Sequence, residues 1–329
     1  MTQQSVHPAE VVPPAAGLPL ARFRPAGRLR QVFLREGLAG YVFVAPWFIG
    51  FVVFTLGPFL ASLYLSTLEW SLLGTAKFVG FGNFTKMFAD DERYIAALKN
   101  TFIYVFVSVP LKQVIALTIA MLLSQELRAI FAYRTVFYLP SVTSGVATSV
   151  LWTQVFGFRM GILNAVLSNV GIQPIPWLTS LQWALPTLIF ISLWNVGSIF
   201  IIYLAGLKGV PLHYYEAAEV DGASPWQKFS KITLPLITPT VFFNLVMGFI
   251  GSFKIFTQAY VMTGGGPADR TLFYVLYLFY KAFQDFRMGY ASAMAWVLFI
   301  IILFFTMIQL SLSKRWVYYE GAAPGGQRV

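Results

Sequence analysis

The chain has 329 residues, of which 57% are hydrophobic and 11% are charged, a composition typical of membrane proteins. It contains no cysteine, which excludes disulfides, thiolate zinc sites and iron–sulfur clusters. The net charge of +10 comes from basic residues spread between apolar stretches, a distribution that favours membrane topology over nucleic-acid binding as its explanation.

Six apolar segments are long enough to cross a bilayer, which takes about 20 residues of helix. We expect the spans near residues 41–65, 101–123, 135–156, 183–206, 238–262 and 288–312, with Pro46 and Pro58 as possible kinks. Residues 1–36 are predicted to be a disordered tail without a cleaved signal peptide. The membrane domain is expected at 37–313 and a second tail at 314–329.

The Lys and Arg residues indicate which way the spans run. Thirteen of them lie in the two tails and in the links after the second and fourth spans, and eight lie in the links on the other side. Because cytoplasmic links are enriched in Lys and Arg, we expect both termini in the cytoplasm. Residues 208–237 then lie on the cytoplasmic side, and residues 66–100 and 263–287 lie outside.

The most polar part of the second half of the chain lies between the fourth and fifth spans. Pro211 suits the first position of a helix, and Asp221-Gly222 is a stop signal, because Gly tolerates the left-handed backbone that ends a helix. Ser224 followed by Pro225 is a restart signal, an N-cap and a first helical residue. The segment is therefore predicted to be a short helix, a sharp turn and a second short helix.

Within this segment, Glu216-Ala217-Ala218 is followed at fixed spacing by Gly222 and by Ile232-x-Leu234-Pro235. The pattern resembles the EAA signature of permease subunits of binding-protein-dependent ABC importers. Further stretches resemble the carbohydrate branch of this family, with its maltose, trehalose and glycerol-3-phosphate permeases. They are residues 78–84, 161–164, 175–178, 263–267, 288–294 and 315–319, so that the resemblance extends over roughly residues 38–319.

The resemblance implies an all-α membrane protein of six transmembrane helices, with the type I ABC importer permease fold and a cytoplasmic coupling helix. It implies a bacterial cytoplasmic (inner) membrane protein that assembles with a second homologous permease subunit, two ATPase subunits and an extracytoplasmic solute-binding protein. The solute would be a sugar, an oligosaccharide or a related compound. ATP and Mg would be bound by the ATPase partner. This chain, which has no Walker A sequence, would bind no cofactor or metal and would not be an enzyme.

In this family the coupling helix fits a groove of the ATPase. The residues assigned to that contact by the resemblance are Leu212, Tyr215, Glu216, Ala217, Ala218, Asp221 and Gly222. Leu212 and Tyr215 are expected to be apolar anchors, and the two alanines leave a slim flank. An ordinary amphipathic loop between two spans is the alternative explanation of the same residues.

In the maltose-type permeases that the chain resembles, the start of span three, the middle of span four and part of span five face the central cavity, so the resemblance implies a solute path there. Carbohydrate sites need hydroxyl-bonding groups beside flat rings, and Trp194, Asn195, Ser198 and Ser252 supply both. The candidates are Ser141, Trp194, Asn195, Ser198, Gly251, Ser252 and Ile255. Gly248, Gly251, Ser252 and Ile255 share one helical face, which also suits close helix packing, and the two explanations stay open. Lys254 and Lys112 are the ionisable groups within the predicted spans. A solute role for Lys254 is undecided, and snorkelling or burial is favoured for Lys112.

Two other classes of protein are weighed against an importer subunit. A gradient-driven carrier commonly places acids in its spans, whereas all thirteen acids here fall outside the predicted ones. A membrane enzyme would need an acid or base constellation at one interface, and the sequence offers none that is credible. Both alternatives are therefore disfavoured.

Overall fold

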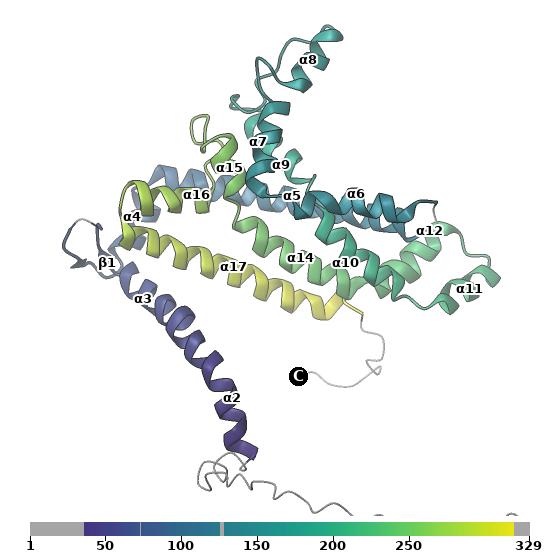
Figure 1. Ribbon diagram of the computed structural model, residues 1–329, viewed down its shortest axis with the longest axis horizontal. Helices are drawn as coiled ribbons and strands as arrows, with labels where there is room; N and C mark the ends of the chain where they lie inside the picture. Colours follow the sequence, from purple (N-terminus) through teal and green to yellow (C-terminus); the bar gives the residue numbers. More distant parts are fainter. Residues whose placement is uncertain (1–35, 73, 126–127, 319–329) are drawn as a thin grey trace, which may run out of the picture. The chain divides into compact units, whose positions relative to one another are not determined.

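The computed structural model describes residues 36–318 except 73 and 126–127, so residues 1–35 of the predicted tail at 1–36 and most of the tail at 314–329 lie outside the described residues. The chain divides into two units, Met1–Leu60 and Ala61–Val329, and each is described by itself. Figure 1 shows the helices and strands with their labels.

The first unit contains α2 (Glu36–Phe51), the single π-helical turn η1 (Val52–Leu56) and the start of α3 (Gly57–Ser66). Pro46 lies inside α2, and Pro58 follows η1. A proline inside a helix clashes with the carbonyl four residues earlier, and widening the preceding turn relieves that clash. The Gly57 N–H accordingly donates to Val52 O, five residues back. The predicted irregularity at Pro58 is therefore a π turn.

In the second unit, a small hairpin and a short helix precede the longest helix. Strands β1 (Leu68–Glu69) and β2 (Lys77–Phe78) pair antiparallel, and α4 (Gly82–Ala89) follows. Helix α5 (Glu92–Ser124) is N-capped by the Asp91 carboxylate, which accepts from the Tyr94 N–H at 3.0 Å. Helix α5 begins earlier than the second predicted span, because the polar residues 92–100, which were expected to belong to a loop, form its first turns.

The next two predicted spans are both interrupted. Residues 135–156 were expected to be one helix, but α6 (Ile130–Val142) ends at Thr143 and α7 (Gly145–Val155) begins after Ser144. The fourth span divides into α9 (Ala184–Ser192) and α10 (Gly197–Lys208), which meet at 42°. Between these pairs lies the short helix α8 (Ile162–Asn169). At the second break the N–H groups of Leu193, Trp194 and Asn195 donate to carbonyls three residues earlier.

The polar segment forms α11 (Leu212–Val220), α12 (Pro225–Lys228), the π turn η2 (Phe229–Thr233) and α13 (Leu234–Leu236). In Figure 1, α11 and α12 lie at the end of the second unit away from α4. As at Pro58, the π turn precedes a proline, and the Leu234 N–H donates to Phe229 O. The part of this segment from Pro225 to Leu236 and the next helix, Thr238–Phe253, form one path with a bend of 64° between them.

The fifth predicted span ends earlier than expected. Helix α14 (Thr238–Phe253) stops at Lys254, whose N–H turns back to Gly251 O at 3.2 Å, and α15 (Thr257–Met262) is a separate helix. The face predicted to join Gly248, Gly251, Ser252 and Ile255 is therefore broken before its last member. The chain continues through α16 (Tyr274–Phe279) and η3 (Tyr280–Gln284) to α17 (Met288–Trp316).

Within the described residues, three helices are long and apolar enough to cross a membrane, at Gly40–Ser66, Glu92–Ser124 and Met288–Trp316. The count rises to five if each of the two bent pairs is one span. The second unit is thus an all-α membrane body apart from its two-residue strands. The pair α6 and α7 covers the remaining predicted span.

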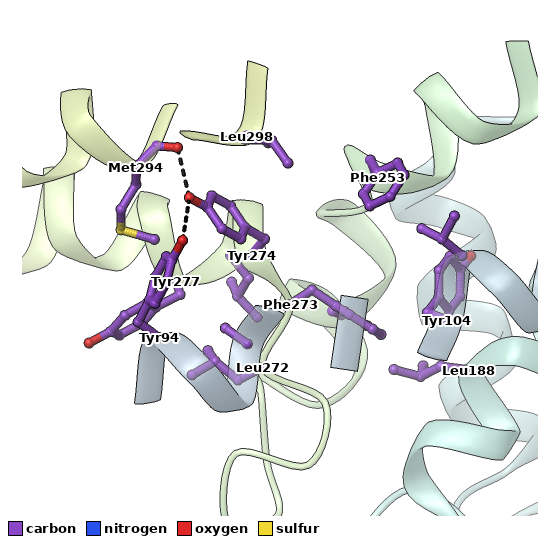
Figure 2. Close-up of a cluster of buried hydrophobic side chains, with 14 of the residues drawn as sticks. Tyr94, Tyr104, Leu188, Phe253, Leu272, Phe273, Tyr274, Tyr277, Met294 and Leu298 are labelled. Atoms are coloured by element: carbon purple, nitrogen blue, oxygen red, sulfur yellow. Dashed lines mark hydrogen bonds between the residues drawn. The ribbon is translucent and has the colours of Figure 1, made fainter. Parts of the chain in front are cut away.

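The core of the second unit forms where α5, α9, α16 and α17 meet (Figure 2). Large aromatic side chains fill it, and Tyr94, Tyr274 and Phe273 are fully buried. The Tyr274 hydroxyl donates to Met294 O at 2.8 Å, so the ring packs without leaving its polar atom unpaired.

A second buried contact joins α5, α10 and α14 nearer the polar segment. The Tyr203 hydroxyl donates to Gln113 Oε1 at 2.6 Å, and Gln113 Nε2 donates to Asn244 O at 3.0 Å. Polar bonds between helices replace the hydrophobic driving force that lipid does not supply. They tie the three helices to one another within the membrane body.

Candidate functional sites

The turn between α11 and α12 is built as the sequence predicts. Gly222 has φ +72°, its N–H donates to Glu219 O at 3.0 Å, and the Ala223 N–H donates to Ala218 O at 2.8 Å. These two bonds form a Schellman motif. At the restart, Ser224 and Gln227 form a reciprocal capping box. Pro211 differs from its predicted place, because it is the N-cap of α11 and Leu212 is the first helical residue.

Two side-chain contacts hold α11 against the segment that follows it. Glu219 forms an ion pair with Lys228 at 2.6 Å, and the Tyr215 hydroxyl lies 2.8 Å from Thr233 Oγ1. Tyr215 is half-buried, and its side chain connects α11 to η2 through this contact with Thr233. Neither contact was predicted, since their partners lie 9 and 18 residues apart in sequence.

The outer surface of α11 carries the features expected of a docking face. Leu212 is 68% exposed and Val220 is 90% exposed, and Trp226 of α12 is 71% exposed. Large apolar side chains at such exposure are of the kind found at interaction sites. Glu216 and Ala217 are exposed beside them, whereas Ala218 faces inward and is buried. Among the described residues, Glu216 has no hydrogen bond or ion pair, so its carboxylate is available to a partner. Asp221 is the C-cap and is exposed.

A groove of about 800 Å³ lies between α5, α10, α11 and α12, and Leu212 and Trp226 border both this groove and the outer surface. Leu212, Tyr215, Trp226 and Phe229 line it, together with Leu122 and Gln125 at the end of α5. The groove separates the α11–α12 pair from the long helices. The short helices are consequently tied to the membrane body mainly through α13 and the chain on either side.

A cavity of about 240 Å³ lies at the break between α6 and α7, facing the break between α9 and α10 and the start of α15. Three of the predicted path residues line it: Trp194, Asn195 and Ile255. Trp194 is 54% exposed and packs edge-to-face on Trp152 at 5.7 Å between ring centroids. The cavity therefore combines aromatic faces with an exposed amide.

The sequence did not single out several other lining residues, namely Thr143, Thr148, Ser149, Trp152, Ser192, Thr257 and Gln258. Thr143 and Thr148 bond to each other at 3.0 Å, and Gln258 Nε2 donates to Leu188 O at 3.1 Å. The run Thr143-Ser144-Gly145 could have indicated the break between α6 and α7, because these residue types favour helix ends over helix interiors.

The remaining predicted path residues are placed outside this cavity. Ser141 packs against Gly197 and donates to Tyr138 O at 2.7 Å, and Ser198 is exposed on the first turn of α10. Ser252 is 8% exposed, whereas Gly251 faces open space. Lys254 is the exposed C-cap of α14. The half-buried Lys112 ammonium lies 5.5 Å from the centre of the Tyr104 ring, a cation–π contact that offsets part of its burial.

The motif at 161–164 and the one at 175–178 meet through one side chain. Asn164 Oδ1 accepts from the Ile175 N–H at 3.1 Å and from Trp177 Nε1 at 2.9 Å, and Asn164 Nδ2 donates to Ile175 O at 2.9 Å. Asn164 thus closes the loop around α8. Its role in the structure is to hold the backbone of that loop.

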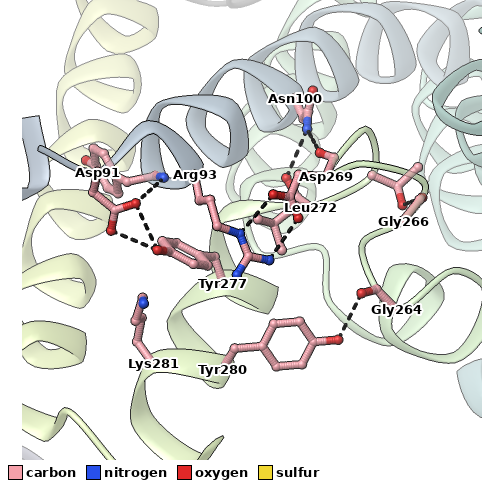
Figure 3. Close-up of polar contacts among 12 residues, drawn as sticks. Asp91, Arg93, Asn100, Gly264, Gly266, Asp269, Leu272, Tyr277, Tyr280 and Lys281 are labelled. Atoms are coloured by element: carbon pink, nitrogen blue, oxygen red, sulfur yellow. Dashed lines mark hydrogen bonds and ion pairs between the residues drawn. The ribbon is translucent and has the colours of Figure 1, made fainter. Parts of the chain in front are cut away.

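A polar network joins the start of α5 to the loop after α15, to α16 and to α17 (Figure 3). Asp91 accepts from the Tyr277 hydroxyl at 2.8 Å and from the Tyr290 hydroxyl at 2.7 Å. Arg93 forms a bidentate pair with Asp269, with both N–O distances at 2.8 Å. The motif Thr263-Gly-Gly-Gly-Pro267 belongs to this region, where Gly264 and Gly265 have φ +57° and +90°.

Asp91 is held as an anion by this network. Burial acts to raise the pKa of its carboxyl, but the hydrogen bonds from Tyr290, Tyr277 and the Tyr94 N–H, together with the charge of Lys281, outweigh burial and lower the pKa below its ordinary value. A lowered pKa in the folded state stabilises the fold above the unfolded pKa of about 4. That contribution is lost as the pH falls through the folded pKa.

Asp91→Asn is expected to lower the stability of the purified chain by about 1 to 2 kcal/mol at pH 7, since solvent reaches the carboxylate and weakens its charged hydrogen bonds. Asn remains a good N-cap, so α5 keeps its start. The difference in unfolding temperature from the natural chain should shrink as the pH is lowered below about 4. Asp90→Asn, at the exposed neighbouring position, is the control. A difference that does not change with pH would contradict a charged Asp91.

Comparison with known proteins places this architecture in a family. Residues 91–318 match the family model described as "Binding-protein-dependent transport system inner membrane component". The chain is 49% identical over 290 residues to the probable ABC transporter permease protein YesP of Bacillus subtilis (strain 168), covering 87% of this chain and 94% of the relative. It is 32% identical to the arabinooligosaccharides transport system permease protein AraP of the same organism, over 86% and 91% of the two chains.

A solved structure has the same fold. In the crystal structure of a bacterial alginate ABC transporter in complex with alginate pentasaccharide-bound periplasmic protein, one chain matches with a TM-score of 0.74 at 26% identity. The match covers 88% of this chain and 98% of that one. The type I importer permease fold is therefore shown, and the protein belongs to the binding-protein-dependent transport system inner membrane components, as a multi-pass permease subunit of an ABC transporter that is not itself the ATPase.

Proposed function

We propose that this chain is one half of the permease of an ATP-driven importer for an oligosaccharide or a related sugar-like solute. The observation that carries the proposal is the cavity at the helix breaks, where Trp152 and Trp194 lie beside Asn195, Thr148 and Gln258. Flat rings next to amides and hydroxyls suit a polyhydroxylated solute. The names of two relatives support this solute class, arabinooligosaccharides for one and alginate for the other.

The size of the cavity supports a shared solute site. Its 240 Å³ is below the roughly 300–1,000 Å³ of sites that enclose a small ligand. This chain would therefore contact part of the solute, and a second homologous permease subunit would supply the rest. A solute-binding protein outside the membrane would deliver the solute, and two ATPase subunits in the cytoplasm would drive the cycle.

We further propose six spans, with α6 and α7 together forming the third, and both termini in the cytoplasm. The bias of Lys and Arg supports this orientation. It places α11 where an ATPase could bind it. ATP binding would close the ATPase pair and draw α11 with it. The π turn η2 and α13 would pass the movement to α14.

The test of the solute site is Asn195→Leu, which removes the exposed amide and fills part of the cavity. Losing one hydrogen bond to the solute costs about 1 kcal/mol, or about fivefold in affinity. We expect uptake of labelled oligosaccharide at low concentration to fall at least about fivefold in cells that express the importer. The amount of permease in the membrane should stay unchanged.

Gln154→Leu is the matched control, because Gln154 is an exposed amide on α7 that does not line the cavity. Its uptake should equal that of the natural chain. If Asn195→Leu and Gln154→Leu transport every accepted solute alike, the cavity does not bind solute.

A further inference from the structure

Helix α5 presents one exposed stripe along its length. The stripe is formed at a spacing of three or four residues by Ile95, Lys99, Ile103, Val107, Leu111, Val114, Thr118 and Leu122. Apart from Lys99 and Thr118, its side chains are apolar. Because such a stripe suits contact with lipid, the one cation within it calls for a chemical explanation.

Lys99 lies at the edge of a cavity of about 600 Å³ that three segments form together. Helix α5 contributes Lys99, Asn100 and Ile103, the start of α9 contributes Leu185 and Pro186, and the loop after α15 contributes Asp269 and Arg270. The side chains of Lys99 and Arg270 are both exposed and, among the described residues, neither has a hydrogen bond or an ion pair. The cavity therefore offers two cations without partners.

Two other polar side chains of this cavity, Asp269 and Asn100, are already bonded within the protein, whereas the exposed amide of Gln182 also lines it. The Asp269 carboxylate is bound by Arg93, which compensates its charge, and Asn100 Nδ2 donates to Asp269 O at 2.7 Å and to Leu272 O at 3.2 Å. These bonds hold the loop that carries Arg270 against α5 (Figure 3). The site is thus built before any ligand binds, and its free charge is positive.

The depth of Lys99 along the helix matches a lipid headgroup. Helix α5 has 33 residues and is about 50 Å long at 1.5 Å per residue, which exceeds a hydrocarbon core of about 30 Å. At the same rise per residue, Lys99 is roughly 38 Å from Ser124 along the helix. This distance is greater than the hydrocarbon core of about 30 Å but less than the roughly 40–45 Å of a bilayer with both headgroup layers. With Ser124 at one headgroup layer, Lys99 lies within the opposite one, whichever way the protein is oriented.

We propose that this cavity binds the headgroup phosphate of an anionic phospholipid. Lys99 and Arg270 contact the phosphate, and the acyl chains lie along Ile103, Val107 and the rest of the apolar stripe. A lipid fits better than an acidic protein segment, because the apolar wall of Ile103, Leu185 and Pro186 continues from the cations into the stripe. The bound lipid would join α5, α9 and the loop after α15.

The test uses the full-length chain in mild detergent and measures lipid binding by native mass spectrometry. The probes are dioleoyl phosphatidylglycerol, dioleoyl phosphatidylcholine with the same acyl chains, and inorganic phosphate. We expect phosphatidylglycerol to bind more tightly than phosphatidylcholine, and the double variant Lys99→Gln/Arg270→Gln to weaken it about tenfold or more, since each cation near anionic lipid contributes several-fold. Lys77→Gln/Arg159→Gln removes the same charge at two exposed positions outside the cavity and should bind as the natural chain does.

Three outcomes would overturn the proposal. Equal binding of the two lipids would show that charge is not recognised. Equal weakening by both double variants would show a general effect of net charge rather than a site. Saturable binding of inorganic phosphate that requires Lys99 and Arg270 but does not displace the lipid would show that these cations bind a soluble anion and that the lipid binds elsewhere.

Discussion

Glu216→Lys is expected to release the ATPase from the membrane complex and abolish transport, while the permease stays folded and inserted. Glu216 is exposed on α11 without a partner among the described residues, and Leu212 and Val220 extend the same face. Charge reversal would repel a basic group in the groove of the ATPase. Losing one partner of a desolvated charge pair costs about 2–5 kcal/mol, or about 30-fold or more in affinity. Co-purification of the ATPase and solute-stimulated hydrolysis measure the effect.

Two variants separate the docking contact from a general effect of charge. Glu216→Gln removes the negative charge without adding a positive one, and we expect a smaller loss of ATPase. Glu69→Lys reverses an exposed glutamate of the hairpin strand β1, and the ATPase should be retained. If Glu216→Lys keeps stoichiometric ATPase and full hydrolysis, Glu216 does not dock the ATPase.

Gly289→Ala is expected to disrupt the packing of α17 against the hairpin, because no space exists for a side chain there. A Cβ at residue 289 would overlap the carbonyl oxygen of Leu68 and lie 3.2 Å from that of Leu65. The Gly289 N–H also donates to Trp70 O at 3.2 Å, so the two backbones are already bonded. Since rigid backbone has to move, we expect a loss of about 3 kcal/mol or more, at the upper end of overpacking. The unfolding temperature of the purified chain measures it.

Gly251→Ala is the matched control for that substitution. Gly251 lies inside α14, and a Cβ there would meet no atom within 4 Å. Alanine is the better helix former by about 1 kcal/mol, so this variant should be as stable as the natural chain or more stable. Should Gly289→Ala unfold at the same temperature as Gly251→Ala, the close approach of α17 to β1 is not important for stability.

The local turns could be predicted because they depend on neighbouring residues alone. Gly222 adopts the positive φ expected after Asp221, and Ser224 caps the next helix as predicted. Both follow from backbone chemistry within one or two turns of helix. Pro174 and Pro176 likewise exclude a long helix, whatever the rest of the chain does.

The interruptions of the spans were missed because hydropathy does not detect them. Thr143-Ser144 and Leu193–Val196 lie in stretches apolar enough to be read as continuous helix, and α14 stops at Lys254 without a proline. A break at such a place is tolerated where neighbouring segments or a cavity satisfy the freed backbone groups. Those neighbours come from other parts of the chain, so the apolar pattern of one segment cannot predict them.

The sequence alone determined the class of this protein, the approximate positions of its apolar segments and the helix–turn–helix at 212–228. These features follow from composition and from interactions between residues close in the chain. Only the tertiary structure decided which side chains meet, such as Asp91 with Tyr277 and Tyr290, or Trp194 with Trp152. Contacts such as the one between Asp91 and Tyr290, 199 residues apart, depend on how the helices pack, and in a bilayer that packing is set by shape and a few polar bonds rather than by hydrophobicity.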